Sequence, residues 1–125
     1  MRGHLIQTGI GMSDWTIEIG RDARSRAVER LMTHAEKTGA AATGASRVFA
    51  SVLLAAYNGD RWACDPTDLA GYGADDQAAG MTILAAKILY GHDGEPHRVI
   101  EDGQARFARL VDAYTGSAYD RHRHL

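Results

Sequence analysis

The amino-acid sequence predicts an all-α fold: a small bundle of four main helices around a central apolar helix at about residues 46–57, with a short helix near 66–70 and an extended N-terminal segment. Two observations predict it. In the run 48–57 only Ser51 is polar, and a helix that is apolar almost all round belongs in the middle of a core. Three further segments repeat apolar residues at helical spacing, and a glycine follows each of them.

The N-terminal segment, residues 1–20, is expected to be extended and partly disordered. Residues 15–19 alternate apolar and polar side chains, which predicts a short strand with one solvated face. Residues 5–8 are the candidate partner for this strand, across a turn at residues 9–11. Disorder before Met12 is the alternative that we favour, since Met12 is also a candidate start of the chain.

The first helix is predicted from about Asp22 to Thr38, and Gly39 ends it. Its buried stripe is formed by Ala23, Ala27, Val28, Leu31, Met32 and Ala35. Arginines and glutamates alternate over the rest of its surface. We interpret that surface as a charged, solvated outer face with weak ion pairs.

The central helix has Thr43 or Ser46 as its candidate N-cap, and Asn58 follows it as a residue that tolerates a helix stop. The pair Asp65 and Pro66 then predicts the short helix, because an N-cap aspartate followed by proline favours a new helical start.

The third helix opens at Asp75 and Asp76, whose charges suit the positive end of its dipole, and Gly91 ends it. Its predicted buried side consists of Ala78, Met81, Leu84, Ala85, Ile88 and Leu89. Gly80 lies inside this helix at a cost of about 1 kcal/mol relative to alanine. We expect close approach to the central helix to explain it.

The fourth helix is predicted to start from an N-cap at Asp102 and to end at Gly116. Its apolar residues Phe107, Leu110, Val111 and Tyr114 follow helical spacing. The predicted organisation is therefore one helical domain over residues 21–116, followed by a mobile tail at 117–125.

Composition limits the class of protein. The net charge of −2 argues against a dedicated nucleic-acid coat, although residues 58–102 carry nine acidic and three basic side chains. Cys64 is the one cysteine, so no internal disulfide forms and a reducing compartment is favoured. No stretch has the apolar length of a signal peptide or membrane span. We therefore expect a cytoplasmic protein without a membrane partner.

Catalytic and metal-binding patterns are weak. His92, Asp93, Glu95 and His97 are potential ligands, but they fall in a predicted loop without the firm spacing of a metal site. Asp65 and Asp68 would raise the pKa of the Cys64 thiol, which disfavours thiolate chemistry. The glycines do not form a phosphate-binding loop. We predict neither a cofactor nor a metal.

The remaining candidate site is an acidic, aromatic loop surface. We predict a non-catalytic protein-binding module that uses Asp60, Arg61, Trp62, Asp65, Asp68, Tyr72, Asp75 and Asp76. The alternative for Trp62 is that it folds back over the end of the central helix. An alternative function is nucleic-acid binding through Arg21, Arg24, Arg26, Arg30 and Arg47. A small hydrolase or transferase is a third possibility, and a homodimer is left open.

The sequence also resembles a known family. The residues that carry the resemblance are Thr43-Gly44, Ser46-Arg47, Leu53-Leu54-Ala55, Tyr57-Asn58 and Asp65-Pro66-Thr67-Asp68-Leu69. Over about residues 27–114 the chain is similar to a small uncharacterised bacterial family found on plasmids, prophages and other mobile elements. It departs from the family pattern at Ala45 and Ala56. The resemblance implies a class of genome and not an activity. By analogy with other proteins of mobile elements, we expect the partner to belong to a host defence or replication complex, with an anti-CRISPR-like inhibitor as one instance.

Overall fold

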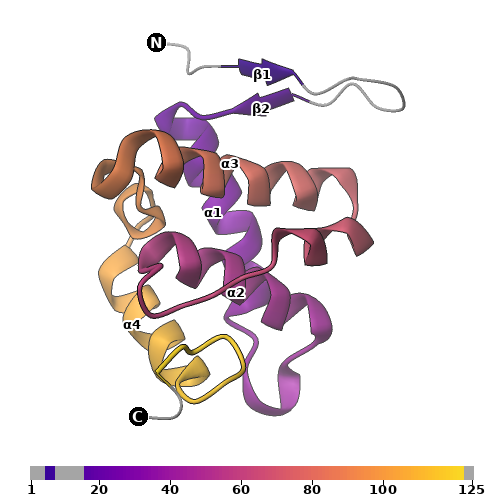
Figure 1. The fold of residues 1–125 in the computed structure, drawn as a ribbon, viewed down its shortest axis with the longest axis vertical. Coiled ribbons are helices and arrows are strands. Elements are labelled where there is room, and N and C mark those ends of the chain that lie inside the picture. The colour runs from indigo at the N-terminus through magenta and orange to yellow at the C-terminus, as the bar shows by residue number, and fades with distance from the viewer. Residues whose placement is uncertain (1–4, 8–15, 123–125) are drawn as a thin grey trace.

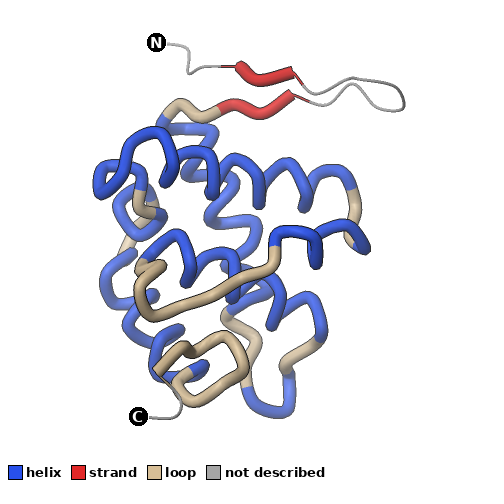
Figure 2. The backbone as a smooth tube through the Cα atoms, in the orientation of Figure 1, coloured by secondary structure: helices blue, strands red, loops and turns tan. Residues whose placement is uncertain are grey.

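The computed structural model describes residues 5–7 and 16–122, and within them the fold is a small all-α bundle, as predicted (Figures 1 and 2). The main helices are α1 (Arg21–Ala35), α2 (Gly44–Tyr57), α3 (Ala74–Tyr90) and α4 (Gly103–Tyr114). Short 3-10 helices connect them: η1 (Gly39–Ala41), η2 (Pro66–Gly71), η3 (Gly91–Gly94) and η4 (Pro96–Val99). No helix of the described residues is both long and apolar enough to cross a bilayer.

A short hairpin precedes the bundle. Strand β1 (Leu5–Gln7) pairs antiparallel with β2 (Thr16–Glu18), with Ile6 opposite Ile17. This is the pairing that one of our two alternatives predicted; the turn that we predicted at residues 9–11 lies outside the described residues. The Thr82 hydroxyl of α3 donates to the Glu18 carbonyl at 3.1 Å, which attaches β2 to α3 (Figure 1).

Helix α2 forms the centre of the core. It packs against α1, α3, α4, η2 and η4, and nearly every residue from Phe49 to Ala56 is buried. The Thr43 hydroxyl accepts from the Ser46 backbone N–H, and the Ser46 hydroxyl accepts from the Thr43 N–H, so both cap candidates act together in a capping box.

Helix α3 buries a different face from the one predicted. The face turned to the core consists of Ala79, Gly80, Thr82, Ile83 and Ala86. The larger residues Met81, Ile88 and Leu89 are exposed. The predicted buried side is therefore wrong for Met81, Ile88 and Leu89, while Leu84 is partly buried against the core. The physical reason is that α3 is apolar on both sides, and its smaller side chains allow closer packing against α1 and α2.

Two local predictions are also corrected. A side chain at Gly80 would meet the Leu69 Cδ1 atom at 2.5 Å, so the close neighbour of this glycine is η2 and not α2. Asp102 lies at the N-cap position of α4 but makes no side-chain cap hydrogen bond, and it has a left-handed backbone with φ of 54°. This turn brings Gly103 directly against the carbonyl of His97.

The segment after α4 packs against the loop that follows α2. We predicted a mobile tail from residue 117, whereas residues 117–122 fold back here. Ala63 N–H donates to the Tyr119 carbonyl at 2.9 Å, and Arg121 N–H donates to the Arg61 carbonyl at 2.8 Å. Trp62 and Asp120 form an antiparallel bridge between the two segments. The ordered structure therefore extends at least to residue 122.

Candidate functional site

Trp62, at the centre of the predicted binding surface, is buried in the structure. The Trp62 side chain is 1% exposed and belongs to the core, as its alternative interpretation had it. Arg61 covers its ring, with the guanidinium carbon 4.7 Å from the ring centroid, and also pairs with the buried Asp120 at 3.1 Å. The C-terminal loop therefore covers what the sequence suggested was an exposed aromatic residue.

The other predicted partner-binding residues have different environments. Asp65 caps η2 by accepting from the Thr67 hydroxyl at 2.7 Å and from the Thr67 N–H at 3.0 Å, and these hydrogen bonds lower the pKa of its carboxyl. Tyr72 is half-buried against Phe49, and Asp76 pairs with Arg30 at 2.8 Å. Asp60, Asp68 and Asp75 are exposed on three different segments of the chain.

The arginines of the nucleic-acid alternative are largely engaged within the protein. Arg21 donates to the Arg98 carbonyl, and Arg24 donates to the Asp93 carbonyl and lies over the Tyr90 ring. Arg30 is neutralised by Asp76. Arg26 and Arg47 are exposed and lie on different helices, α1 and α2.

The most prominent exposed feature is an apolar stripe along the outside of α3. We call Met81, Leu84, Ala85 and Ile88 the α3 outer face. Met81 is 37% exposed and Ile88 is 81% exposed, while Leu84 and Ala85 are half-buried. Leu89 and Tyr90 extend the exposed apolar surface to the end of the helix. The sequence identified this stripe as apolar and in need of cover, but placed it in the core.

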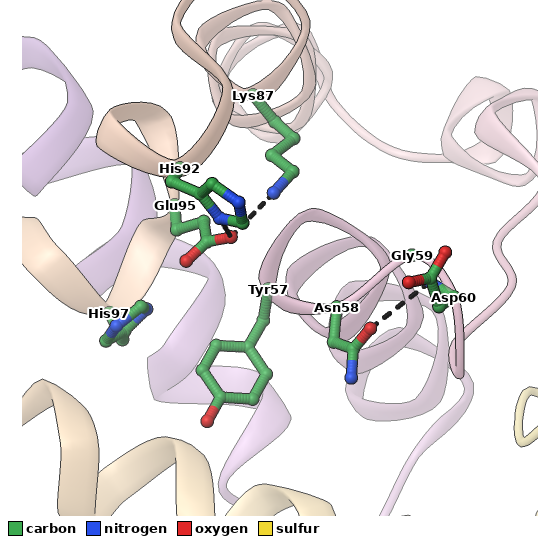
Figure 3. A pocket seen from close by; sticks show the side chains of 8 residues that line it. All are labelled: Tyr57, Asn58, Gly59, Asp60, Lys87, His92, Glu95 and His97. Carbon is green, nitrogen blue, oxygen red and sulfur yellow. Dashed lines mark hydrogen bonds and ion pairs between the residues drawn. The ribbon is translucent and has the colours of Figure 1, made fainter.

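A polar pocket of about 490 Å³ lies beside the end of α3 (Figure 3). We call it the Glu95 pocket. It is lined by the end of α2 and the loop after it, by Lys87, and by residues of η3 and η4: Tyr57, Asn58, Gly59, Asp60, Lys87, His92, Glu95 and His97. Gly94 is packed directly against the Ala86 carbonyl, which places the next residue, Glu95, within reach of α3.

Glu95 is the electrostatic centre of this pocket. Its Oε2 atom accepts from Lys87 Nζ at 2.7 Å and lies 3.0 Å from His92 Nδ1 (Figure 3). Burial acts to raise the pKa of the Glu95 carboxyl, but the hydrogen bonds from Lys87 and His92 outweigh burial and hold this pKa below its usual value. Glu95 is therefore ionised and compensated, and it ties η3 to α3.

His97 borders the same pocket without joining this network. Its ring packs edge-on against Tyr57 at 5.0 Å between centroids, and its buried Nδ1 has no hydrogen-bond partner among the described residues. Burial lowers the pKa of His97, so the ring is neutral at physiological pH. In the described part of the chain, no group of three or more potential ligands is placed to hold a metal ion.

Cys64 is half-buried, and burial is the main cause of its raised pKa, with Asp65 and Asp68 adding to it. The direction predicted from the two aspartates is confirmed, although their charge is the smaller cause. A thiol with a raised pKa is mostly protonated at neutral pH, which makes it a poor nucleophile.

The model of a protein family, described as a family of unknown function, matches residues 25–115. This range contains the extent of the resemblance seen in the sequence. No curated protein and no solved structure matches the chain. The origin on mobile elements and the partner in a defence or replication complex remain predictions.

Proposed function

We propose that this chain, which belongs to the family of unknown function DUF7673, is a non-catalytic protein-binding module that docks through the α3 outer face and whose partner is a second copy of the chain. One observation carries the proposal. The third helix has two apolar faces, and the fold covers one of them while it leaves Ile88 81% exposed. An apolar helix face of this kind is typical of an interaction surface.

The spacing of the stripe allows it to pair with a second copy of itself. In an antiparallel pair of α3 helices, a two-fold axis between Leu84 and Ala85 places Met81 of one copy opposite Ile88 of the other. The small Ala85 then lies at the crossing point, where it allows close approach of the two helices. From residue 77 to residue 86 the helix has no charged side chain that would have to be desolvated.

The helix dipoles favour the antiparallel arrangement, because antiparallel pairing places the positive end of one helix beside the negative end of the other. A contact made by one helix pair is small, so we expect a weak, concentration-dependent dimer.

Sedimentation equilibrium of the wild-type chain and of Ile88→Glu tests the proposal. Burial of an isoleucine side chain contributes about 2 kcal/mol, and each dimer contains two copies of it. We therefore expect Ile88→Glu to weaken self-association at least about 100-fold. Ala108→Glu, a matched change at an exposed position of α4, should leave the dimer intact. A wild-type chain that stays monomeric at high concentration would overturn the proposal.

Disulfide trapping tests the orientation of the helices. In a Cys64→Ser background, Ala85→Cys should cross-link to itself because it lies next to the two-fold axis. Met81→Cys alone should not, whereas a mixture of Met81→Cys and Ile88→Cys should form a mixed cross-link. Cross-linking of Met81→Cys with itself, without the mixed product, would contradict the antiparallel arrangement.

A further inference from the structure

A second pocket is lined by residues outside α3, and the proposed function does not use it. It has a volume of about 390 Å³ and forms where the linker between α1 and α2 meets the first turn of α2 and the end of α4. Arg47, Tyr114, Ser117 and Tyr119 supply its polar groups, and Ala42 and Ala113 are among its apolar ones. We call it the Arg47 pocket.

The charge in the Arg47 pocket is uncompensated. Arg47 is exposed, and within the described residues it has no carboxylate at ion-pair distance, in contrast to Arg30, Arg61 and Arg106. No aspartate or glutamate lines the pocket. The Arg47 guanidinium is therefore available to an anion, and its planar array of N–H donors suits a carboxylate or a phosphate.

Tyr114 adds a hydroxyl that lacks an acceptor. This residue is 7% exposed, and its buried Oη has no hydrogen-bond partner among the described residues. Burial raises the pKa of Tyr114, while the positive charge of Arg47, which lines the same pocket, acts in the opposite direction. The phenol keeps its proton at physiological pH, so it is a donor. A buried donor left without an acceptor is unfavourable.

Tyr119 adds a second tyrosine hydroxyl to the Arg47 pocket. Burial is the main cause of its raised pKa and the negative charge of Asp68 adds to it, so this phenol is also a neutral donor at physiological pH. The pocket thus brings together one cation and two tyrosine hydroxyls, without a competing carboxylate on its walls. Such a set of donors recognises oxygen atoms that carry negative charge.

We propose that the Arg47 pocket binds a small oxyanion, a phosphate monoester or a carboxylate, through Arg47 and the Tyr114 hydroxyl. The alanine side chains leave room for an apolar group attached to the anion. A single unpaired cation in a pocket suits a small anion better than a nucleic acid, because polyanion binding needs several cations along a surface.

NMR titration of the full chain tests this inference, with inorganic phosphate, phenyl phosphate and benzoate as separate probes at constant ionic strength. We expect saturable shifts of amide signals around Thr38, Arg47 and Ser117. The preferred probe distinguishes a phosphate site from a carboxylate site. Arg47→Gln should weaken binding about tenfold or more, since a charge-assisted hydrogen bond is lost. Arg26→Gln, a change of an exposed arginine outside the pocket, should not.

Tyr114→Phe separates binding from folding. The variant removes the unpartnered hydroxyl and leaves the ring, so we expect it to be at least as stable as the wild type and to bind the anion several-fold more weakly. Shifts that do not saturate, or that are equal in Arg47→Gln, Arg26→Gln and the wild type, would overturn the inference. Shifts confined to α3 would do so as well.

Discussion

Substitution of Gly94 is the sharpest test of how the end of α3 is built. Gly94 lies at the end of η3, directly against the Ala86 carbonyl group. A methyl group at this position would overlap the carbonyl oxygen and would lie 2.6 Å from the carbonyl carbon and 3.1 Å from Lys87 N, where ordinary contacts begin at 3.4 Å. Every one of these neighbours is backbone, so no flexible side chain can move aside.

The cost of Gly94→Ala follows from this geometry. Relief of the overlap requires the η3 backbone to move away from α3, and such overpacking costs about 1–3 kcal/mol, with larger values where the backbone is involved. The movement also draws Glu95 away from Lys87, to which it is bonded at 2.7 Å. We expect a loss of about 3 kcal/mol in the free energy of unfolding, which lowers the Tm of a domain of this size by about 10 °C.

Equilibrium denaturation and thermal melting of the two chains measure this loss. Gly71→Ala is the matched control, because a methyl group at Gly71 would meet no atom within 4 Å and Gly71 has no positive φ. The control should leave stability unchanged or raise it slightly. If Gly94→Ala has the same Tm as the control, the close packing of η3 on α3 is wrong.

Three further predictions concern single contacts. Thr43→Ala removes the side-chain cap of α2 and should lower the free energy of unfolding by about 1 kcal/mol in a denaturant titration; an unchanged midpoint would argue against the capping box. The pKa of Glu95 is depressed in the folded protein, so its contribution to stability is complete above the usual carboxyl pKa and is lost as the pH falls through the folded-state value. The Tm of Glu95→Gln should therefore depend less on pH over the acid range than the Tm of the wild type. Asp120 accepts from Arg61, Gly116 N–H and His122 N–H, and we expect Asp120→Ala to release the C-terminal loop and to speed its cleavage in limited proteolysis, whereas Asp112→Ala should not.

The parts of the fold that the sequence predicted correctly depend on local patterns. The central helix follows from an apolar run of ten residues, and its cap from Thr43 and Ser46, which lie three residues apart. The cap at Asp65 depends on the residues that follow it directly. In each case the interacting groups are neighbours in the sequence, so spacing and residue type are sufficient to predict the contact.

The errors arise where distant segments decide between two local possibilities. Both faces of α3 are apolar, and helical spacing cannot show which one α1 and α2 will cover. The size of Met81, Leu84 and Ile88 favoured the wrong face. Trp62 lies in a polar loop, which is typical of a surface aromatic residue. Its pairing with Asp120, 58 residues further along the chain, could not be read from that local pattern. The Glu95 pocket was visible only as a group of potential ligands, because nothing in the sequence indicated that Lys87 would neutralise the carboxylate.

The packing of Gly94 and Glu95 against the end of α3 and the exposed side chain of Ile88 have different roles, and two variants separate them. Gly94 and Glu95 fix where the helix ends, whereas Ile88 points away from the protein and contributes little to its stability. Ile88→Glu should therefore weaken self-association at least about 100-fold and leave the Tm of the monomer unchanged. Gly94→Ala should lower the Tm and, through displacement of the helix end, also weaken the dimer. If Ile88→Glu instead unfolds the chain, the α3 outer face is part of the core and cannot be a docking surface.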